Sequence, residues 1–141
     1  MKSRYAIAFS VALGGCAVAP EQPSSSASWP AQSNRKAVAS LVDQAQTEAS
    51  AGHLGNAAAS MERAIRLEPK NARLWQELAR LRLNQREYVQ AENVAMKANT
   101  LIRGDDTLRA QNWGIIAQAR EARGDTAGAR TARELAKRVE Y

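Results

Sequence analysis

The feature that most constrains this chain is a repeated spacing of small residues. Between residues 72 and 105, large apolar residues precede a run of alanines: Trp75, Leu78 and Leu81, followed by Ala91, Ala95 and Ala98. The members of each set are three or four residues apart, which places them on one face of a helix. A short polar segment, residues 84–87, separates the two sets. The segment is therefore predicted to form two antiparallel helices, with bulky side chains on the first and small ones where the second approaches.

The same pattern occurs on both sides of this segment. A shift of 34 residues aligns Leu41 with Trp75, and a shift of 38 residues aligns Trp113 with it. Alanine fills the same three positions in each copy: Ala45, Ala57 and Ala64; Ala79, Ala91 and Ala98; Ala117, Ala129 and Ala136. Nine alanines in register are unexpected from composition alone, so the chain is predicted to be a stack of three helical hairpins.

This pattern resembles the tetratricopeptide repeat, whose period is about 34 residues. The resemblance covers residues 38–141. It implies an all-α fold in which the hairpins 38–71, 72–109 and 110–141 stack as a short right-handed superhelix. The sequence departs from the family at Gln44, where a leucine is usual, at Glu48, Arg82 and Arg120, where a tyrosine is usual, and at Arg133, where an aromatic residue is usual.

Capping residues set the expected helix boundaries. Ser33 or Asn34 is predicted to cap the first helix, which ends before Gly52. The second helix ends before Pro69, and Asn71 caps the next one.

Four extra residues, 103–106, delay the third repeat and are predicted to open the angle between the second and third hairpins. They include Arg103-Gly104-Asp105, a cell-adhesion tripeptide in other settings. We interpret the glycine and aspartate as an ordinary helix stop and helix cap. The Gly124-Asp125 turn corresponds to the turn at Gly52.

Residues 1–15 have the layout of a secretory signal: a basic start, then an apolar run too short to span a bilayer. Residues 13–16 (LGGC) resemble a bacterial lipobox, which implies cleavage before Cys16 and acylation of its thiol. An ordinary signal peptide with a chance cysteine is the alternative. We favour the lipobox because the chain's single cysteine stands at this position. Acyl chains would then hold the protein on a membrane.

The segment after the signal is predicted to be a tether. Residues 16–33 contain Pro20, Pro23 and Pro30 with serines between them and lack helical periodicity. Extended, such a segment reaches about 50 Å from the membrane. Ala17 replaces the aspartate that marks inner-membrane retention in the lipoproteins that this one resembles, so the expected location is the inner leaflet of the outer membrane, facing the periplasm. The repeat domain follows, from residue 34 to residue 141.

Catalysis finds no support in the residue types. The only histidine, His53, falls in a glycine-flanked turn, and no cysteine and histidine cluster or glycine-rich phosphate loop is present. Acidic and basic residues are interspersed at helix-surface spacing, which predicts pairs such as Glu62 with Arg66 and Glu134 with Arg138. We therefore expect no enzyme, no metal site and no cofactor.

The net charge of +6 belongs to the full chain; removal of Lys2 and Arg4 with the signal leaves +4. Nucleic-acid binding is not expected, because the basic residues are not clustered with aromatic residues between them. The basic excess suits partners with acidic surfaces or polyanionic envelope material.

The family resemblance implies a concave groove lined by the first helix of each repeat. The corresponding groove residues are Val42, Gln46 and Ala49; Arg73, Gln76, Arg80 and Leu83; and Gln111, Gly114 and Gln118. The lysine and asparagine that grip peptide carboxylates in chaperone-binding members are missing.

Arg73 and Arg80 lie two turns apart on one helix and, beside Gln76, would hold an acidic or extended peptide by charge-assisted hydrogen bonds. The alternative is that both arginines pair with surface carboxylates such as Glu77 or Glu48. Trp75 and Trp113 are expected to supply core bulk between helices.

These features predict a non-enzymatic outer-membrane lipoprotein that binds another envelope protein. The layout resembles the short tetratricopeptide lipoproteins that activate a class A penicillin-binding protein, a peptidoglycan synthase. An adaptor for a peptidoglycan hydrolase or its protease, a pilotin-like assembly factor, and an enzyme or sugar-binding module remain alternatives. The oligomeric state stays open at this point.

Overall fold

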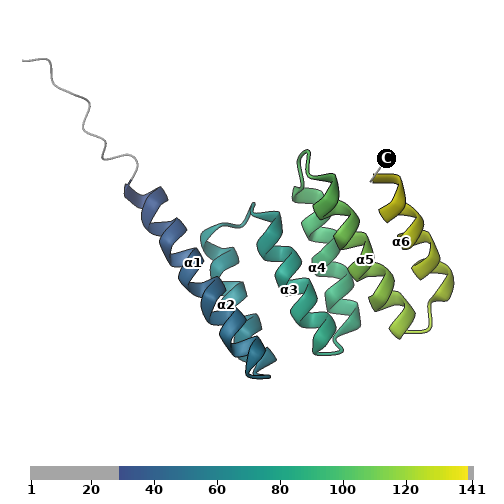
Figure 1. The fold of residues 1–141 in the computed structure, drawn as a ribbon, viewed down its shortest axis with the longest axis horizontal. Coiled ribbons are helices and arrows are strands. Elements are labelled where there is room, and N and C mark those ends of the chain that lie inside the picture. Colours follow the sequence, from purple (N-terminus) through teal and green to yellow (C-terminus); the bar gives the residue numbers. More distant parts are fainter. Residues whose placement is uncertain (1–28, 140–141) are drawn as a thin grey trace, which may run out of the picture.

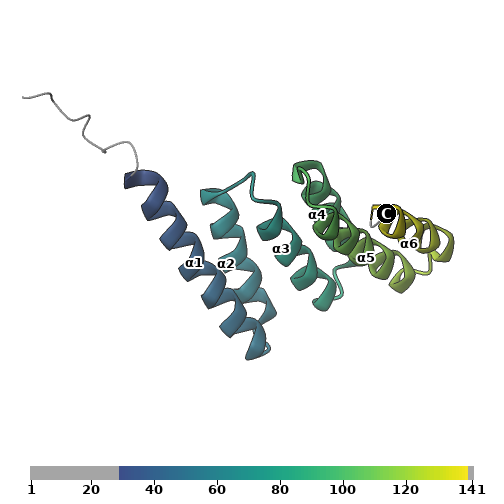
Figure 2. The same ribbon diagram turned by 45° about the horizontal axis from the view of Figure 1, so that its top comes forward.

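The computed structural model of the chain describes residues 29–139. Within them the chain forms six helices: α1 (Trp29–Ser50), α2 (Leu54–Leu67), α3 (Ala72–Asn84), α4 (Tyr88–Leu101), α5 (Asp106–Ala122) and α6 (Thr126–Val139). The helices form three hairpins that follow one another in a row from α1 to α6 (Figures 1 and 2). Each helix packs against the next, and α3 also contacts α5. The predicted all-α stack of three hairpins is confirmed.

Alanines hold the hairpins together. Eight of the nine alanines that align the repeats are at most 2% exposed, and the ninth, Ala136 of α6, is half-buried. A methyl side chain lets two helix backbones approach closely, and the close-packed interior leaves no room for a larger group. The register of small residues read from the sequence is therefore the register of the core.

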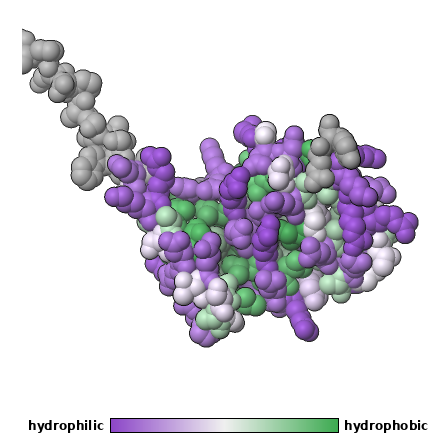
Figure 3. All heavy atoms as spheres, in the orientation of Figure 1, coloured by the Kyte–Doolittle hydropathy of each residue, from purple (hydrophilic) through white to green (hydrophobic). Residues whose placement is uncertain are grey.

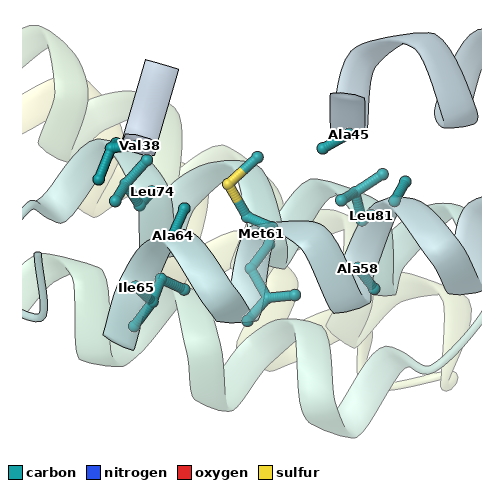
Figure 4. Packing of buried hydrophobic residues seen from close by; sticks show 10 residues of the cluster. Val38, Ala45, Ala58, Met61, Ala64, Ile65, Leu74 and Leu81 are labelled. Carbon is teal, nitrogen blue, oxygen red and sulfur yellow. The ribbon is translucent and has the colours of Figure 1, made fainter. Parts of the chain in front are cut away.

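Apolar side chains form one core on each side of α3. In the first, Met61 of α2 has Leu74 and Leu81 of α3 on either side of it (Figure 4). The second core joins residues of α3, α4, α5 and α6, among them Ala79 and Ile116. Trp75 packs against the first core and Trp113 against the second, and both are half-buried. The two tryptophans thus supply core bulk, as the sequence predicts.

The predicted caps of the middle helices are present. The side chain of Asn71 accepts a hydrogen bond from the backbone N–H of Arg73 at 3.2 Å, at the start of α3. Asp105 does the same for α5, with Leu108 N–H as donor at 2.9 Å. Gly104 precedes it with a φ of 70°, a left-handed conformation that suits glycine. Asp105 therefore caps α5 as predicted, whereas α4 already ends at Leu101 and Ile102 is extended, so Gly104 lies in the connection and does not end the helix.

The first helix starts earlier than predicted. It begins at Trp29, so Ser33 and Asn34 lie inside α1 rather than at its cap. Pro30 stands in the first turn of α1, where a proline costs no hydrogen bond because the first N–H groups of a helix have no partner within it. The boundary predicted between tether and repeat domain, at residue 34, therefore falls within α1. The predicted signal, Cys16 and the remaining tether lie outside the described residues.

Arginines replace two family tyrosines with ion pairs between helices. Arg82 of α3 donates to Glu62 of α2 at 2.5 Å and to Glu87 at 2.8 Å. Arg120 of α5 donates to Glu92 of α4 at 2.8 Å. Each guanidinium joins the first helix of a repeat to the second helix of the repeat before it.

The two ion pairs predicted within single helices, Glu62 with Arg66 and Glu134 with Arg138, do not form in this part of the chain, and Glu62 pairs with Arg82 instead. Side chains three or four residues apart attract weakly. The guanidinium of Arg82, on the neighbouring helix, donates to Glu62 and Glu87 at once, and sequence spacing does not reveal this arrangement. Across residues 29–139, no helix combines the length and apolar character that a bilayer crossing requires.

Candidate partner-binding groove

A hollow of about 430 Å³ lies between α3 and α5. Its walls come from Arg80, Leu83 and Asn84 of α3 and from Gln111, Gly114, Ile115 and Gln118 of α5. Five of these seven residues belong to the groove predicted from the family resemblance: Arg80, Leu83, Gln111, Gly114 and Gln118. We call this hollow the α3–α5 groove.

The α3–α5 groove offers amide groups around a partly apolar floor. Gln111 and Gln118 are exposed, whereas Ile115 is buried and Leu83 is half-buried. A side-chain amide carries both donors and acceptors, so it can match the N–H and C=O groups of an extended peptide. Gly114 has no side chain, and a Cβ atom placed on it would meet nothing within 4 Å. The backbone of α5 is therefore open to close approach from the groove.

Gln76, another predicted groove residue, is not available to a ligand. Its side chain is 3% exposed and its Nε2 atom donates to Gln111 Oε1 at 3.2 Å and to Leu108 O at 3.5 Å. A buried amide without partners costs free energy, so these hydrogen bonds stabilise Gln76 in its buried position. Gln76 therefore ties α3 to α5 and holds one wall of the groove in place.

The two arginines do not act together as a clamp in this structure. Arg73 Nη2 donates to Asp105 Oδ2 at 2.9 Å, and Arg73 lies in another hollow, near Leu101 and Ile102. Arg80 makes only a loose pair with Glu77 at 3.9 Å. The structure favours the alternative in which both arginines pair with carboxylates. Since an exposed pair contributes little, Arg80 can exchange Glu77 for a partner's carboxylate.

The remaining predicted groove residues, Val42, Gln46 and Ala49, lie on α1. Gln46 and Ala49 of α1 line a smaller hollow of about 70 Å³ with Met61, Glu77 and Leu81. Val42 is half-buried and packs against the first core. On the face seen in Figure 3, apolar side chains lie in patches between hydrophilic ones.

Sequence reasoning missed Asn84 and Ile115 as groove residues. Asn84 lies four residues after Arg80, and Ile115 four residues after Gln111, so both continue helical rows that had already been assigned to the groove. Extending each row by one turn would have found them.

Comparisons with known proteins agree with this architecture. Residues 48–106 match the tetratricopeptide repeat family. The chain is also similar to the globular C-terminal domain of LpoP from P. aeruginosa, with 43% sequence identity and a TM-score of 0.69, over 71% of this chain and 94% of that one.

The chain therefore belongs to the tetratricopeptide-repeat family, as the sequence predicts. Within that family it is related to the LpoP domain over nearly all of that domain's length.

A second solved structure, the N-terminal domain of stress-induced protein-1 (STI-1) from C. elegans, has 19% identity and a TM-score of 0.66, over 76% of this chain and 94% of that one. This likeness is one of fold alone. A search of curated proteins finds no match.

Proposed function

We propose that this protein is an outer-membrane lipoprotein that binds a class A penicillin-binding protein and activates it in peptidoglycan synthesis, without catalysing a reaction itself. The observation that carries the proposal is the 43% identity to the LpoP domain. The layout of the sequence supports it, because a lipobox, a short tether and three repeats resemble the small lipoproteins that activate these synthases. The fold itself is that of a protein–protein interaction module.

The α3–α5 groove suits a segment of the synthase in extended conformation. Gln111, Gln118 and Asn84 would pair with its main chain, and Arg80 would take a carboxylate. Leu83 and Ile115 provide apolar contact beneath them. A groove held by the buried Gln76 bridge is formed before binding, so less conformational entropy is lost when the partner arrives.

Activation by binding requires a difference in affinity between two states of the synthase. A ligand shifts an equilibrium only as far as it binds one state better than the other. We propose that the groove binds a segment that is accessible in the active arrangement of the synthase. An adaptor for a hydrolase or protease, or a pilotin-like factor, would use the same groove for a different partner.

Gly114 provides a test that separates binding from folding. Gly114→Leu places a side chain in the groove, whereas Gly114→Ala adds a single methyl group and serves as the matched control. Both changes remove a glycine from a helix interior, which favours folding by about 0.5–1 kcal/mol.

The measurement is the Kd for the purified periplasmic part of a class A penicillin-binding protein from the same organism. Gly114→Leu should weaken binding at least about tenfold, or about 1.4 kcal/mol, while Gly114→Ala binds as the native chain does. Equal binding by both variants would remove the groove from the proposal. If the native chain binds a hydrolase, protease or secretin and no synthase, the activator assignment fails.

A further inference from the structure

The turn between α3 and α4 has an arginine where the other hairpins have glycine. The repeat shifts align Arg86 with Gly52 and Gly124, and all three residues have positive φ angles, of 62°, 82° and 83°. The same two backbone hydrogen bonds close each turn; in this one, Arg86 N–H donates to Leu83 O and Glu87 N–H donates to Arg82 O. Glycine adopts this left-handed conformation without the steric cost that a side chain brings. Glycine would therefore stabilise this turn better than arginine does, and the turn itself does not explain the arginine.

The side chain of Arg86 is free to contact a partner. Arg86 is exposed and has no ion pair within residues 29–139. The nearby carboxylates are already engaged: Glu87 pairs with Arg82, and Glu92 pairs with Arg120 and Arg123. No carboxylate of the described residues therefore holds the Arg86 guanidinium in an ion pair.

Apolar surface lies beside this charge. Val89 is 53% exposed, more than the other large hydrophobic side chains of the described residues, and Tyr88 is half-buried. Arg86, Tyr88 and Val89 line one hollow with Glu87, Gln90 and Arg123, the last of which comes from the turn after α5. Glu87 is paired with Arg82. We call Arg86, Tyr88, Val89 and Arg123 the turn patch. A basic group beside exposed apolar surface is complementary to a carboxylate that is followed by an apolar side chain.

We propose that the turn patch is a second contact for the synthase bound in the groove, and that it takes a segment carrying a carboxylate next to an apolar side chain. This inference rests on the proposed function. The patch lies near one end of the groove, because Asn84 lines the groove at the last residue of α3 and Arg86 lies in the turn that follows α3. A segment leaving the groove at Asn84 would cross the turn at Arg86.

Substitutions at Arg86 separate this role from a structural one. Arg86→Gly relieves the left-handed strain, and Arg86→Asn keeps a residue that tolerates this conformation while removing the charge. Both should weaken the Kd for the periplasmic part of the penicillin-binding protein about tenfold. Melting temperatures should stay equal to that of the native chain or rise by up to about 4 °C. Arg86→Lys keeps the charge and should recover most of the affinity, and Val89→Ser should weaken binding as well.

The outcomes distinguish this inference from the function on which it rests. If Gly114→Leu weakens binding but Arg86→Gly, Arg86→Asn and Val89→Ser all bind like the native chain, the turn patch is not a contact and the proposed function stands. If the native chain does not bind the synthase, the proposed function fails and the turn patch, defined for that partner, fails with it. Weaker binding together with an unchanged or higher melting temperature supports the inference.

Discussion

Asn112 of α5 provides a quantitative test of how the repeats pack. It is 0% exposed, and neither its Nδ2 nor its Oδ1 atom has a hydrogen-bond partner in the described structure. The repeat alignment places it at the position of Leu74, which lies buried in the first core. Leaving a buried polar group without a partner costs about 1–3 kcal/mol. The third repeat therefore has an amide where the second has a leucine, and this unpaired amide lowers the stability of the third repeat.

Asn112→Leu should stabilise the protein. Leucine has the same number of side-chain heavy atoms with the same branching, so it fills the site without enlarging it much. We expect the free energy of unfolding to rise by about 2 kcal/mol, which corresponds to a melting temperature about 8 °C higher for a domain of this size. Urea and thermal unfolding followed by circular dichroism measure both quantities.

The reciprocal change, Leu74→Asn, is the control and should lower stability by about 3 kcal/mol, because it removes apolar contacts and buries an unpaired amide. Binding of a partner should not change with Asn112→Leu, since the side chain does not reach the surface. A less stable Asn112→Leu variant would refute the reasoning and show that the amide of Asn112 has hydrogen-bond partners.

Two further predictions concern packing and anchoring. Ala91→Trp should prevent folding, because Ala91 of α4 is fully buried and a close-packed core has no room for an indole ring. The same change at the exposed Ala59 should leave a cooperative transition. A cooperatively folded Ala91→Trp variant would contradict the repeat alignment. Cys16→Ser should leave the protein uncleaved or soluble in cell fractionation, and normal recovery with the outer membrane would remove the lipobox.

The fold could be predicted because alanines recur at the same positions in each hairpin, where two helices pack closely together. Ala57, Ala91 and Ala129 are buried at the same place in successive hairpins, so spacing alone determines the packing. The start of α1 was predicted less accurately, because Pro30 is compatible both with a tether and with the first turn of a helix.

The site was only partly predictable, because pairing depends on residues that the fold brings together. The positions of groove residues in the repeat family identify Arg80, Gln111 and Gln118. They do not reveal that the buried Gln76 donates a hydrogen bond to Gln111. Asp105 illustrates the same point, since it caps α5 and also pairs with Arg73, 32 residues earlier in the chain. Sequence spacing reports which helix face a residue occupies, whereas its partner on the next helix depends on how the helices pack.

We propose that the groove binds a peptidoglycan synthase and thereby activates it. The most direct measurement is the rate of glycan strand synthesis by the purified class A penicillin-binding protein from the same organism, with the native chain, Gly114→Ala or Gly114→Leu added in excess. The native chain and Gly114→Ala should raise the rate, and Gly114→Leu should leave it near the rate of the synthase alone. An unchanged rate with the native chain, or equal stimulation by Gly114→Leu, would contradict the account.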